Sequence, residues 1–178
     1  MLVQRWVFGV NLLTGEASEL FYGGEVSDTE RALLRAVSEV APSQRAALLW
    51  LTQANAPQRL AIYYLLYKHH AGRREFDHAQ RAAELGLLHA ARQAGIPEDY
   101  RCVTPNPELD FTGDGPLRFW LFTLKALAFI RLRSGDAGGA ADLLKRVARL
   151  APNSGLGDEV VDAMLRAAID SGSVERQT

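Results

Sequence analysis

The sequence predicts an all-α protein, and three observations along its 178 residues support that class. From residue 27 onward, apolar side chains recur every three or four positions, which places them on one face of an α-helix. Gly and Pro stand between the expected helices, where helices end. No apolar–polar alternation typical of strands follows residue 26. Strand is therefore expected, if anywhere, only in the first 26 residues.

Residues 1–26 differ in composition from the rest of the chain. The stretch RWVFGVNLLTGEASELFYGG carries the aromatic and β-branched residues of strands, with Thr14 and Gly15 as a candidate turn. A small β-hairpin and an extended arm packed on the first helix fit this composition equally well. Gly23 and Gly24 end the segment.

A first helical group is expected in residues 27–95, and it begins with a capping box. Ser27 can accept a hydrogen bond from the amide of Glu30, whose carboxylate can reach back to the start of the helix. Pro42 ends this helix, and Ser43 is expected to cap a second one.

Two further helices are expected in this group. Residues 58–70 are apolar on nearly every side, which marks a buried central helix. In residues 76–94, small residues recur at helical spacing, so that a neighbouring helix can approach closely. These small residues are Ala79, Ala83, Gly86, Ala90 and Ala94. Gly95 followed by Pro97 ends the helix.

A loop with several prolines is expected in residues 96–116, and it is longer than a simple connection. The helical pattern resumes from Pro116 and gives a second helical group in residues 117–171. The remaining residues, 172–178, are expected to form a frayed tail. The whole chain, 1–178, is therefore expected to form a single domain.

Within the second group, residues 121–154 have the pattern of a helix–turn–helix unit. Gly135 and Asp136 stand at the turn, and Ala128 and Ala140 are the small residues that let the two helices approach. Further interface and end positions are held by Leu127, Leu144, Leu150, Pro152 and Asn153. This unit resembles one tetratricopeptide repeat (TPR), which has about 34 residues, and the resemblance implies TPR-like antiparallel helical hairpins, as in a fragment of an α-solenoid.

A weaker copy of the repeat precedes this unit, with Ala71 and Gly72 at the turn and Pro97 at the end. It lacks the small residue of the first helix, and its turn is longer. The final helix, residues 157–170, is expected to cover the open end of the stack. A generic helical bundle with a Gly-Asp turn is the alternative architecture.

In TPR proteins, the first helix of a repeat turns its ligand-facing residues toward the concave side. The resemblance therefore implies a groove lined by Phe122, Lys125, Phe129, Leu132 and Arg133. Lys125 fits the clamp that some members use for a C-terminal carboxylate, but Phe129 stands where that clamp has Asn. Two aromatic side chains and a Leu beside two cations suit an apolar anchor flanked by acidic residues. The alternative is that Phe122 and Phe129 pack against the preceding hairpin.

The composition argues against several classes of binding partner and several cellular locations. The formal net charge is -1, so no global field attracts nucleic acid or an anionic membrane. No apolar run approaches the roughly 20 residues that span a bilayer, and the N-terminus lacks the pattern of a signal peptide. Cys102 is the only cysteine, which excludes an intramolecular disulfide and favours a reducing compartment. We therefore expect a cytoplasmic protein.

No motif of a known catalytic site occurs, so we expect neither an enzyme nor a cofactor. The stretch DFTGDG, residues 110–115, resembles the start of a calcium loop. Leu121, however, stands at its twelfth position, where a bidentate Glu is needed, so a plain turn is expected. The four histidines include no pair at the spacing of a helical metal site, and no metal is expected. They are His69, His70, His78 and His89.

These observations predict a protein–protein interaction scaffold or adaptor that binds a peptide or helix in a helical-repeat groove. The alternative is a small-ligand-binding regulatory domain in which residues 100–116 act as a lid.

Overall fold

The computed structural model describes residues 27–113 and 115–152, and Arg166. The helices in this part are α1 (Asp28–Glu39), α2 (Pro42–Asn55), α3 (Leu60–Gly72), α4 (Phe76–Ala94), the short 3-10 helix η2 (Tyr100–Cys102), α5 (Pro116–Ser134) and α6 (Ala137–Leu150). The described residues contain no strand, so the predicted all-α class is confirmed. The arm or hairpin expected in residues 1–26, and the helix and tail expected after residue 156, lie outside the described residues.

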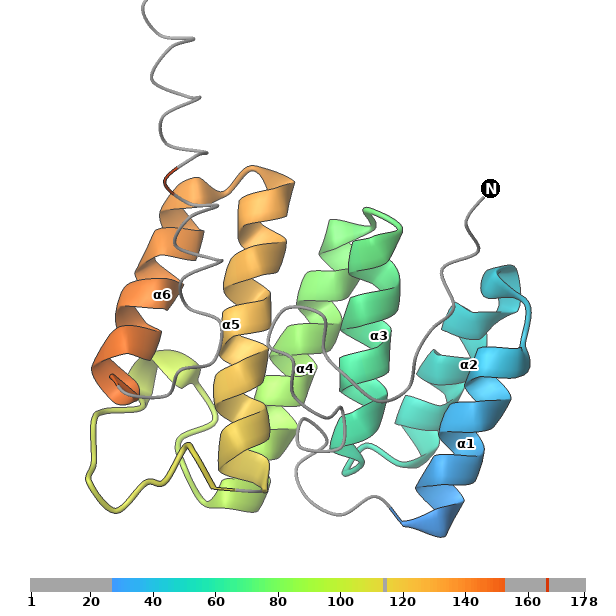
Figure 1. The fold of residues 1–178 in the computed structure, drawn as a ribbon, viewed down its shortest axis with the longest axis horizontal. Coiled ribbons are helices and arrows are strands. Elements are labelled where there is room, and N and C mark those ends of the chain that lie inside the picture. Colours follow the sequence, from blue (N-terminus) through green and yellow to red (C-terminus); the bar gives the residue numbers. More distant parts are fainter. Residues whose placement is uncertain (1–26, 114, 153–165, 167–178) are drawn as a thin grey trace, which may run out of the picture.

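The α-helices stand side by side in the order in which they follow along the chain (Figure 1). α1 with α2, α3 with α4, and α5 with α6 form antiparallel hairpins, each joined by a short turn. The helices make their main contacts with their neighbours in the chain, and α3 also touches α5. The predicted helical hairpins are therefore confirmed, while membership of the TPR family stays a prediction.

Two helices differ from the sequence expectations, α3 and the start of α2. α3 covers Leu60–Gly72, whereas the sequence places this helix at residues 58–70 and a turn at Ala71 and Gly72. α1 begins directly after Ser27, the expected capping residue. The sequence pattern places an N-cap at Ser43, but Pro42 is itself the first residue of α2, and Ala41 lies at the N-cap without a side-chain hydrogen bond. The prediction of a Ser43 cap is therefore wrong. Proline fits this place because its missing N–H would have no partner in the first turn.

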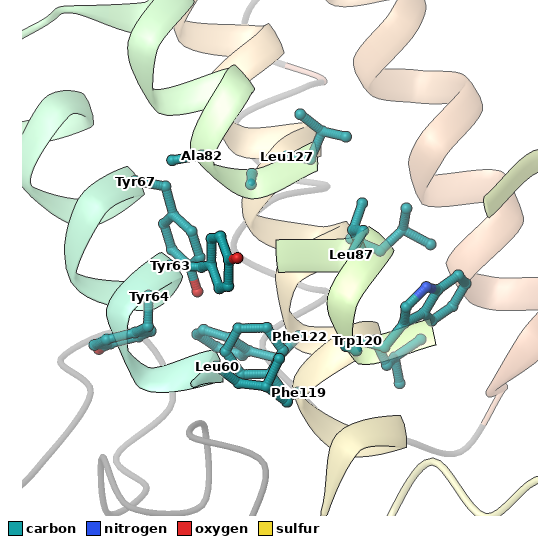
Figure 2. Close-up of a cluster of buried hydrophobic side chains, with 14 of the residues drawn as sticks. Leu60, Tyr63, Tyr64, Tyr67, Ala82, Leu87, Phe119, Trp120, Phe122 and Leu127 are labelled. Atoms are coloured by element: carbon teal, nitrogen blue, oxygen red, sulfur yellow. The ribbon is translucent and has the colours of Figure 1, made fainter. Parts of the chain in front are cut away.

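α3 forms the centre of the core, as its apolar sequence predicts. Every residue from 60 to 67 is buried, because α2, α4 and α5 all pack against this helix. Figure 2 shows Tyr63 of α3 in a cluster with the aromatic side chains of Phe119 and Phe122. The Tyr63 hydroxyl donates a hydrogen bond to the carbonyl oxygen of Pro57 at 2.7 Å. The one polar atom of this buried ring is thereby satisfied.

α4 approaches α3 through small side chains, as predicted. Its buried small residues are Ala79, Ala82, Ala83, Gly86, Ala90 and Ala91. A Cβ atom placed on Gly86 would lie 3.0 Å from the Cβ atom of Tyr63, so Gly86 allows the two helices to come this close. Ala94 is only half-buried because it lies at the helix end. Gly95 follows it in the left-handed conformation expected of a helix C-cap.

The loop between α4 and α5 is anchored to the rest of the domain. Val103 and Phe111 are 2% and 3% exposed, and the Phe111 ring lies 5.8 Å from the ring of Trp120 in α5. The Asp110 carboxylate accepts hydrogen bonds from the amide and the hydroxyl of Thr112, at 2.8 and 2.7 Å. These bonds, the hydroxyl bond first, hold the pKa of Asp110 below its usual value. Within DFTGDG, residues 110–113 are therefore held together by hydrogen bonds to the Asp110 side chain.

The turn between α5 and α6 has the geometry that its Gly-Asp pair predicts. Gly135 has a φ of 97°, the left-handed conformation that ends α5. The Asp136 carboxylate accepts a hydrogen bond from the Gly139 amide at 2.8 Å and so caps α6. Ala128 and Ala140 are fully buried, as expected of the two small interface positions. No helix among the described residues has the length and apolar character needed to cross a membrane.

Candidate binding site

The structure buries two of the five side chains that the TPR resemblance assigns to a groove. Phe122 and Lys125, on the first half of α5, are 9% and 5% exposed. The Phe122 ring lies 6.1 Å from the ring of Tyr64 in α3. Phe122 therefore packs against the preceding hairpin, which is one of the two arrangements that the sequence leaves open.

The other three predicted groove residues keep some exposed surface. Phe129 and Leu132 are half-buried, and Arg133 is exposed. The Arg133 guanidinium carbon lies 5.7 Å from the centre of the Phe129 ring, within the range of a cation–π contact. These three residues could contribute an apolar and cationic contact at the end of α5, and the groove stays a prediction.

A cleft that the sequence did not reveal lies between the α4–α5 loop, α5 and α6. Its volume is about 450 Å³, and it is partly open to solvent. It is lined by Tyr100, Arg101, Arg131, Gly139, Asp142, Leu143, Lys145, Arg146 and Arg149. We call this the basic cleft, because the described residues of its lining contribute five cationic side chains and one carboxylate.

One face of α6 forms the longest wall of the basic cleft. Gly139, Asp142, Arg146 and Arg149 follow one another at intervals of three or four residues, the spacing of one helix face. At a rise of about 1.5 Å per residue, this wall is about 15 Å long. The lining of the cleft therefore follows α6 over this length.

Two arginines join the loop to the α5–α6 hairpin and hold the cleft in shape. Arg131, near the end of α5, donates a hydrogen bond to the Tyr100 hydroxyl at 3.3 Å. Arg146 of α6 donates one to the carbonyl oxygen of Val103, also at 3.3 Å. Because Val103 is itself buried, the loop wall is fixed by packing as well as by hydrogen bonds.

The ion pairs around the basic cleft are loose or exposed. Arg131 lies 4.0 Å from both Glu84 and Asp136, and Lys145 lies 3.5 Å from Asp142. Pairs of this kind contribute about 0–1 kcal/mol each in water. They leave these cations able to exchange their partners for the carboxylates of a ligand.

Asp99 and Arg101 form the tightest ion pair at the rim of the cleft. Arg101 Nε lies 2.9 Å from Asp99 Oδ1, and both side chains are largely exposed. Hydrogen bonds from the Arg101 side chain and amide hold the pKa of Asp99 below its usual value. Asp99 is therefore ionised at neutral pH and neutralises Arg101 in the absence of a ligand.

A second group of chemically capable side chains lies at the α3–α4 turn. Nitrogen atoms of His69 and His70 and a carboxylate oxygen of Glu75 lie within 4.8 Å of one another. Sequence reasoning missed this group, because it considered only the spacing between histidines and not a carboxylate beyond the end of the helix. Ligand atoms of this kind at this spacing raise the question of a metal ion.

The hydrogen bonds of His70 argue against a metal ion at this turn. Its Nε2 atom accepts from Trp50 Nε1 at 3.0 Å, since indole nitrogen is only a donor. Nδ1 must then carry the proton, which it donates to Glu75 Oε2 at 2.7 Å. Neither ring nitrogen of His70 is left for an ion. The group is a hydrogen-bond network that ties α2 to the α3–α4 turn, and we call it the Trp50–His70–Glu75 network.

The charges around this network favour a neutral His69 and an ionised Glu75. Burial, followed by the neighbouring His70 and Arg73, lowers the pKa of His69. Hydrogen bonds from Arg73 and His70 lower the pKa of Glu75 to about 2. Arg73 Nε lies 2.8 Å from Glu75 Oε1, so this arginine is already engaged with an acidic partner.

No protein-family model, no curated protein and no solved structure matches the chain. The candidate sites are therefore defined by the geometry and charge of the residues described above. A sequence signal for the basic cleft exists in α6, where Lys145, Arg146 and Arg149 follow within five residues. The contribution of the loop has no such local signal, because it depends on tertiary contacts.

Proposed function

We propose that the protein is an interaction scaffold, which binds a peptide or helix of a partner protein without chemical change. The supporting observation is the serial packing of the hairpins, in which each helix makes its main contacts with its chain neighbours. Stacks of this kind leave long side surfaces uncovered, and repeat proteins use such surfaces to hold extended partners. The TPR resemblance of residues 121–154 agrees with this proposal.

Binding is proposed rather than catalysis because His70 and Glu75, which converge in the described part of the chain, are engaged in hydrogen bonds of the fold. In the described part of the chain, the cluster of His69, His70 and Glu75 is the one where histidine and acidic ligand atoms converge. Two hydrogen bonds occupy both nitrogens of His70, and Glu75 is bonded to His70 and Arg73. The single cysteine, Cys102, is exposed and suits a reducing compartment, so we place the scaffold in the cytoplasm.

A small-ligand-binding regulatory domain is the second candidate, and the basic cleft favours it. Tyr100 and Arg101 of the loop line the cleft, whose volume falls within the range of small-molecule sites. Such sites are usually lined by apolar side chains, whereas here cationic side chains predominate. The anchoring of the loop by Val103 and Phe111 also disfavours a lid that opens widely. We therefore rank this function below that of a scaffold.

Affinity capture with the full chain tests the two functions. The tagged protein is incubated with a lysate of the cells from which it comes, and the captured material is measured by gel electrophoresis and native mass spectrometry. One stoichiometric protein partner supports the scaffold, and a retained small molecule supports the regulatory domain. Capture of neither, with the folded protein confirmed by circular dichroism, contradicts both.

The predicted groove can be tested with the captured partner. Substitution of Lys125 is unsuitable, because a charge reversal at a buried position would destabilise the domain. Phe129→Ala combined with Arg133→Glu removes the exposed apolar and cationic contact and is expected to weaken binding about tenfold. Arg81→Glu, on the exposed surface of α4, is the matched control. Equal affinity of the two variants would exclude the end of α5 as the contact surface.

A further inference from the structure

We infer that the basic cleft binds an acidic segment of a protein partner in extended conformation. This inference rests on the proposed scaffold function and names the chemistry of its partner. The side chains that would hold the carboxylates are Arg131, Lys145, Arg146 and Arg149, with Arg101 at the rim.

The charge of the lining selects an anionic ligand. The lining has five cationic side chains and one carboxylate, Asp142, in a chain whose net charge is -1. Three more carboxylates lie beside the cleft, and they belong to Glu84, Asp99 and Asp136. All three are substantially exposed, so their pairing with the cleft cations is screened by water. A ligand that brings several carboxylates at once can replace these contacts.

The shape of the cleft selects an extended ligand. The wall formed by α6 is about 15 Å long, and an extended peptide rises about 3.3 Å per residue. About four or five residues of such a peptide would therefore lie along this length of the helix. Arg146 and Arg149 are one helical turn apart, so their guanidinium groups can meet different side chains of the peptide.

The cationic groups of the cleft favour several carboxylates along a peptide rather than a single phosphate group. Phosphate sites commonly use the free amides at a helix N-terminus. Here the first turn of α6 is already capped, since the Gly139 amide donates to the Asp136 carboxylate. Four of the five cations are arginines, whose planar guanidinium groups bind carboxylates with two parallel hydrogen bonds.

The same lining disfavours single-stranded nucleic acid. Sequence-independent binding of single strands relies on aromatic rings on which bases stack. Among the described residues that line the cleft, Tyr100 is the one aromatic residue, and the Arg101 guanidinium carbon lies 5.8 Å from the centre of its ring. A base that stacks on Tyr100 would have to displace the Arg101 side chain. An acidic peptide can instead bind Arg101 in its present position.

A direct binding experiment with defined probes tests the inference. The full chain is titrated into the fluorescein-labelled peptide Glu-Glu-Asp-Glu-Glu-Asp, and binding is measured by fluorescence anisotropy. A peptide in which Gln and Asn replace Glu and Asp is the control. We expect saturable binding of the acidic peptide alone, and weaker binding when NaCl rises from about 50 to about 200 mM.

Charge-reversed variants show where the peptide binds. Lys145→Glu with Arg149→Glu, both at exposed positions of the lining, is expected to weaken binding of the acidic peptide by about tenfold or more. The matched control is Arg35→Glu with Arg81→Glu, which changes the net charge by the same amount at exposed positions outside both the cleft and the predicted groove. Circular dichroism and thermal melting confirm that both variants fold. If the two variants weaken binding equally, the loss of affinity comes from the change in net charge, and the cleft is not the binding site.

Three further outcomes also decide against the cleft. The inference fails if the acidic peptide does not bind, if inorganic phosphate binds with higher affinity, or if a single-stranded oligonucleotide binds with higher affinity. The affinity capture described above separates this failure from that of the scaffold. A partner retained equally by the wild type and the Lys145→Glu, Arg149→Glu variant leaves the scaffold proposal intact and contradicts the cleft as the binding site. Peptide binding without any captured protein supports the anion site and contradicts the scaffold.

Discussion

The α3–α4 turn and the α5–α6 turn reverse the chain by different physical means. At the α5–α6 turn, Gly135 takes the left-handed conformation and Asp136 caps the next helix, so local backbone chemistry suffices. At the α3–α4 turn, the left-handed position is held by Arg74, with a φ of 62°. The helix that follows has no side-chain cap at Glu75, whose carboxylate instead accepts from His70 and Arg73.

The difference shows how a turn without favourable local residues can still be formed. A non-glycine residue in the left-handed region is less stable there than glycine would be. The Trp50–His70–Glu75 network fixes the α3–α4 turn through side chains, and it reaches α2, which lies outside the hairpin. The α5–α6 turn is formed by residues of its own hairpin, and its link to α4 is the loose Arg131–Glu84 pair at 4.0 Å. The first turn therefore couples two hairpins through short hydrogen bonds, and the second is held by local backbone chemistry.

The largest expected effect comes from the close approach of α3 and α4. Gly86→Leu places a side chain where even a Cβ atom would lie 3.0 Å from Tyr63, and we expect it to lower the free energy of unfolding by about 3 kcal/mol. The matched control is Gly138→Ala in α6, where a Cβ atom meets nothing within 4 Å. It should raise stability by about 0.5–1 kcal/mol. Urea unfolding followed by circular dichroism measures both, and equal effects would show that α3 and α4 are not closely packed.

The next largest effect concerns the coupling of the α3–α4 turn to α2. His70→Ala leaves Trp50 Nε1 without its acceptor and Glu75 without one donor, and we expect a loss of about 2 kcal/mol. Asp136→Ala removes the cap of the other turn and should cost about 1 kcal/mol. Hydrogen exchange measured by mass spectrometry should show faster exchange in α2 for the His70 variant alone. Faster α2 exchange in both variants would mean that the two turns do not differ in this way.

Exchanging the residues at the two left-handed positions should move stability in opposite directions. Gly135→Ala forces a side chain into a φ of 97° and is expected to cost about 1 kcal/mol. Arg74→Gly relieves the left-handed conformation but adds freedom to the unfolded chain, so a gain below about 1 kcal/mol is expected. Urea midpoints of the two variants against the wild type provide the measurement. A loss of stability in Arg74→Gly would show that the Arg74 side chain contributes more than its backbone strain removes.

The smallest effect is a dependence on pH that belongs to the α3–α4 hairpin alone. Burial, as the largest cause, lowers the pKa of His69 and His89 below the ordinary value of 6.5. Below pH 6.5, these histidines therefore bind protons in the unfolded chain before they do so in the folded chain. Their contribution to the free energy of unfolding is full above pH 6.5, and it falls as the pH drops toward their lower pKa values in the folded chain. Glu75 stays ionised in this window, since its pKa is about 2.

Urea midpoints at about pH 7.5 and about pH 5 measure this dependence, because histidine is the side chain that titrates between them. The midpoint of the wild type should be lower at the acidic pH. His69→Gln combined with His89→Gln should reduce the difference between the two midpoints. An unchanged difference in this variant would assign the acid sensitivity to other groups.

The sequence predicted those features that depend on neighbouring residues. α4 has the expected bounds, because Gly95 and Pro97 end it by local backbone chemistry. The burial of α3 follows from its apolar composition, and the α5–α6 turn follows from its Gly-Asp pair. The N-cap of α2 was wrongly assigned to Ser43. The pair Pro42-Ser43 fits both a helix that starts after a Ser cap and a helix that has Pro in its first turn, and the backbone conformation shows the second.

The candidate sites could be predicted only in part, because tertiary contacts build them. Trp50 and His70 are 20 residues apart, and Arg146 and Val103 are 43 residues apart. No periodic pattern links such positions before the order of the helices is known. The five predicted groove residues came from a repeat alignment, which orders positions along α5 but does not describe what packs on each. The alignment therefore suggested a surface cation at Lys125, whereas the structure buries this side chain.

Serial packing also implies that stability is graded along the chain. α3 is enclosed by three helices, whereas α1 makes its main contacts with α2 alone among the described helices. Opening α1 therefore exposes less apolar surface than opening α3, and hydrogen exchange is expected to be faster in α1. In such an array the contacts are mostly local, so each hairpin can add to its neighbour as a separate step of folding. A partner that binds across two hairpins would join these steps and make the domain unfold as a larger unit.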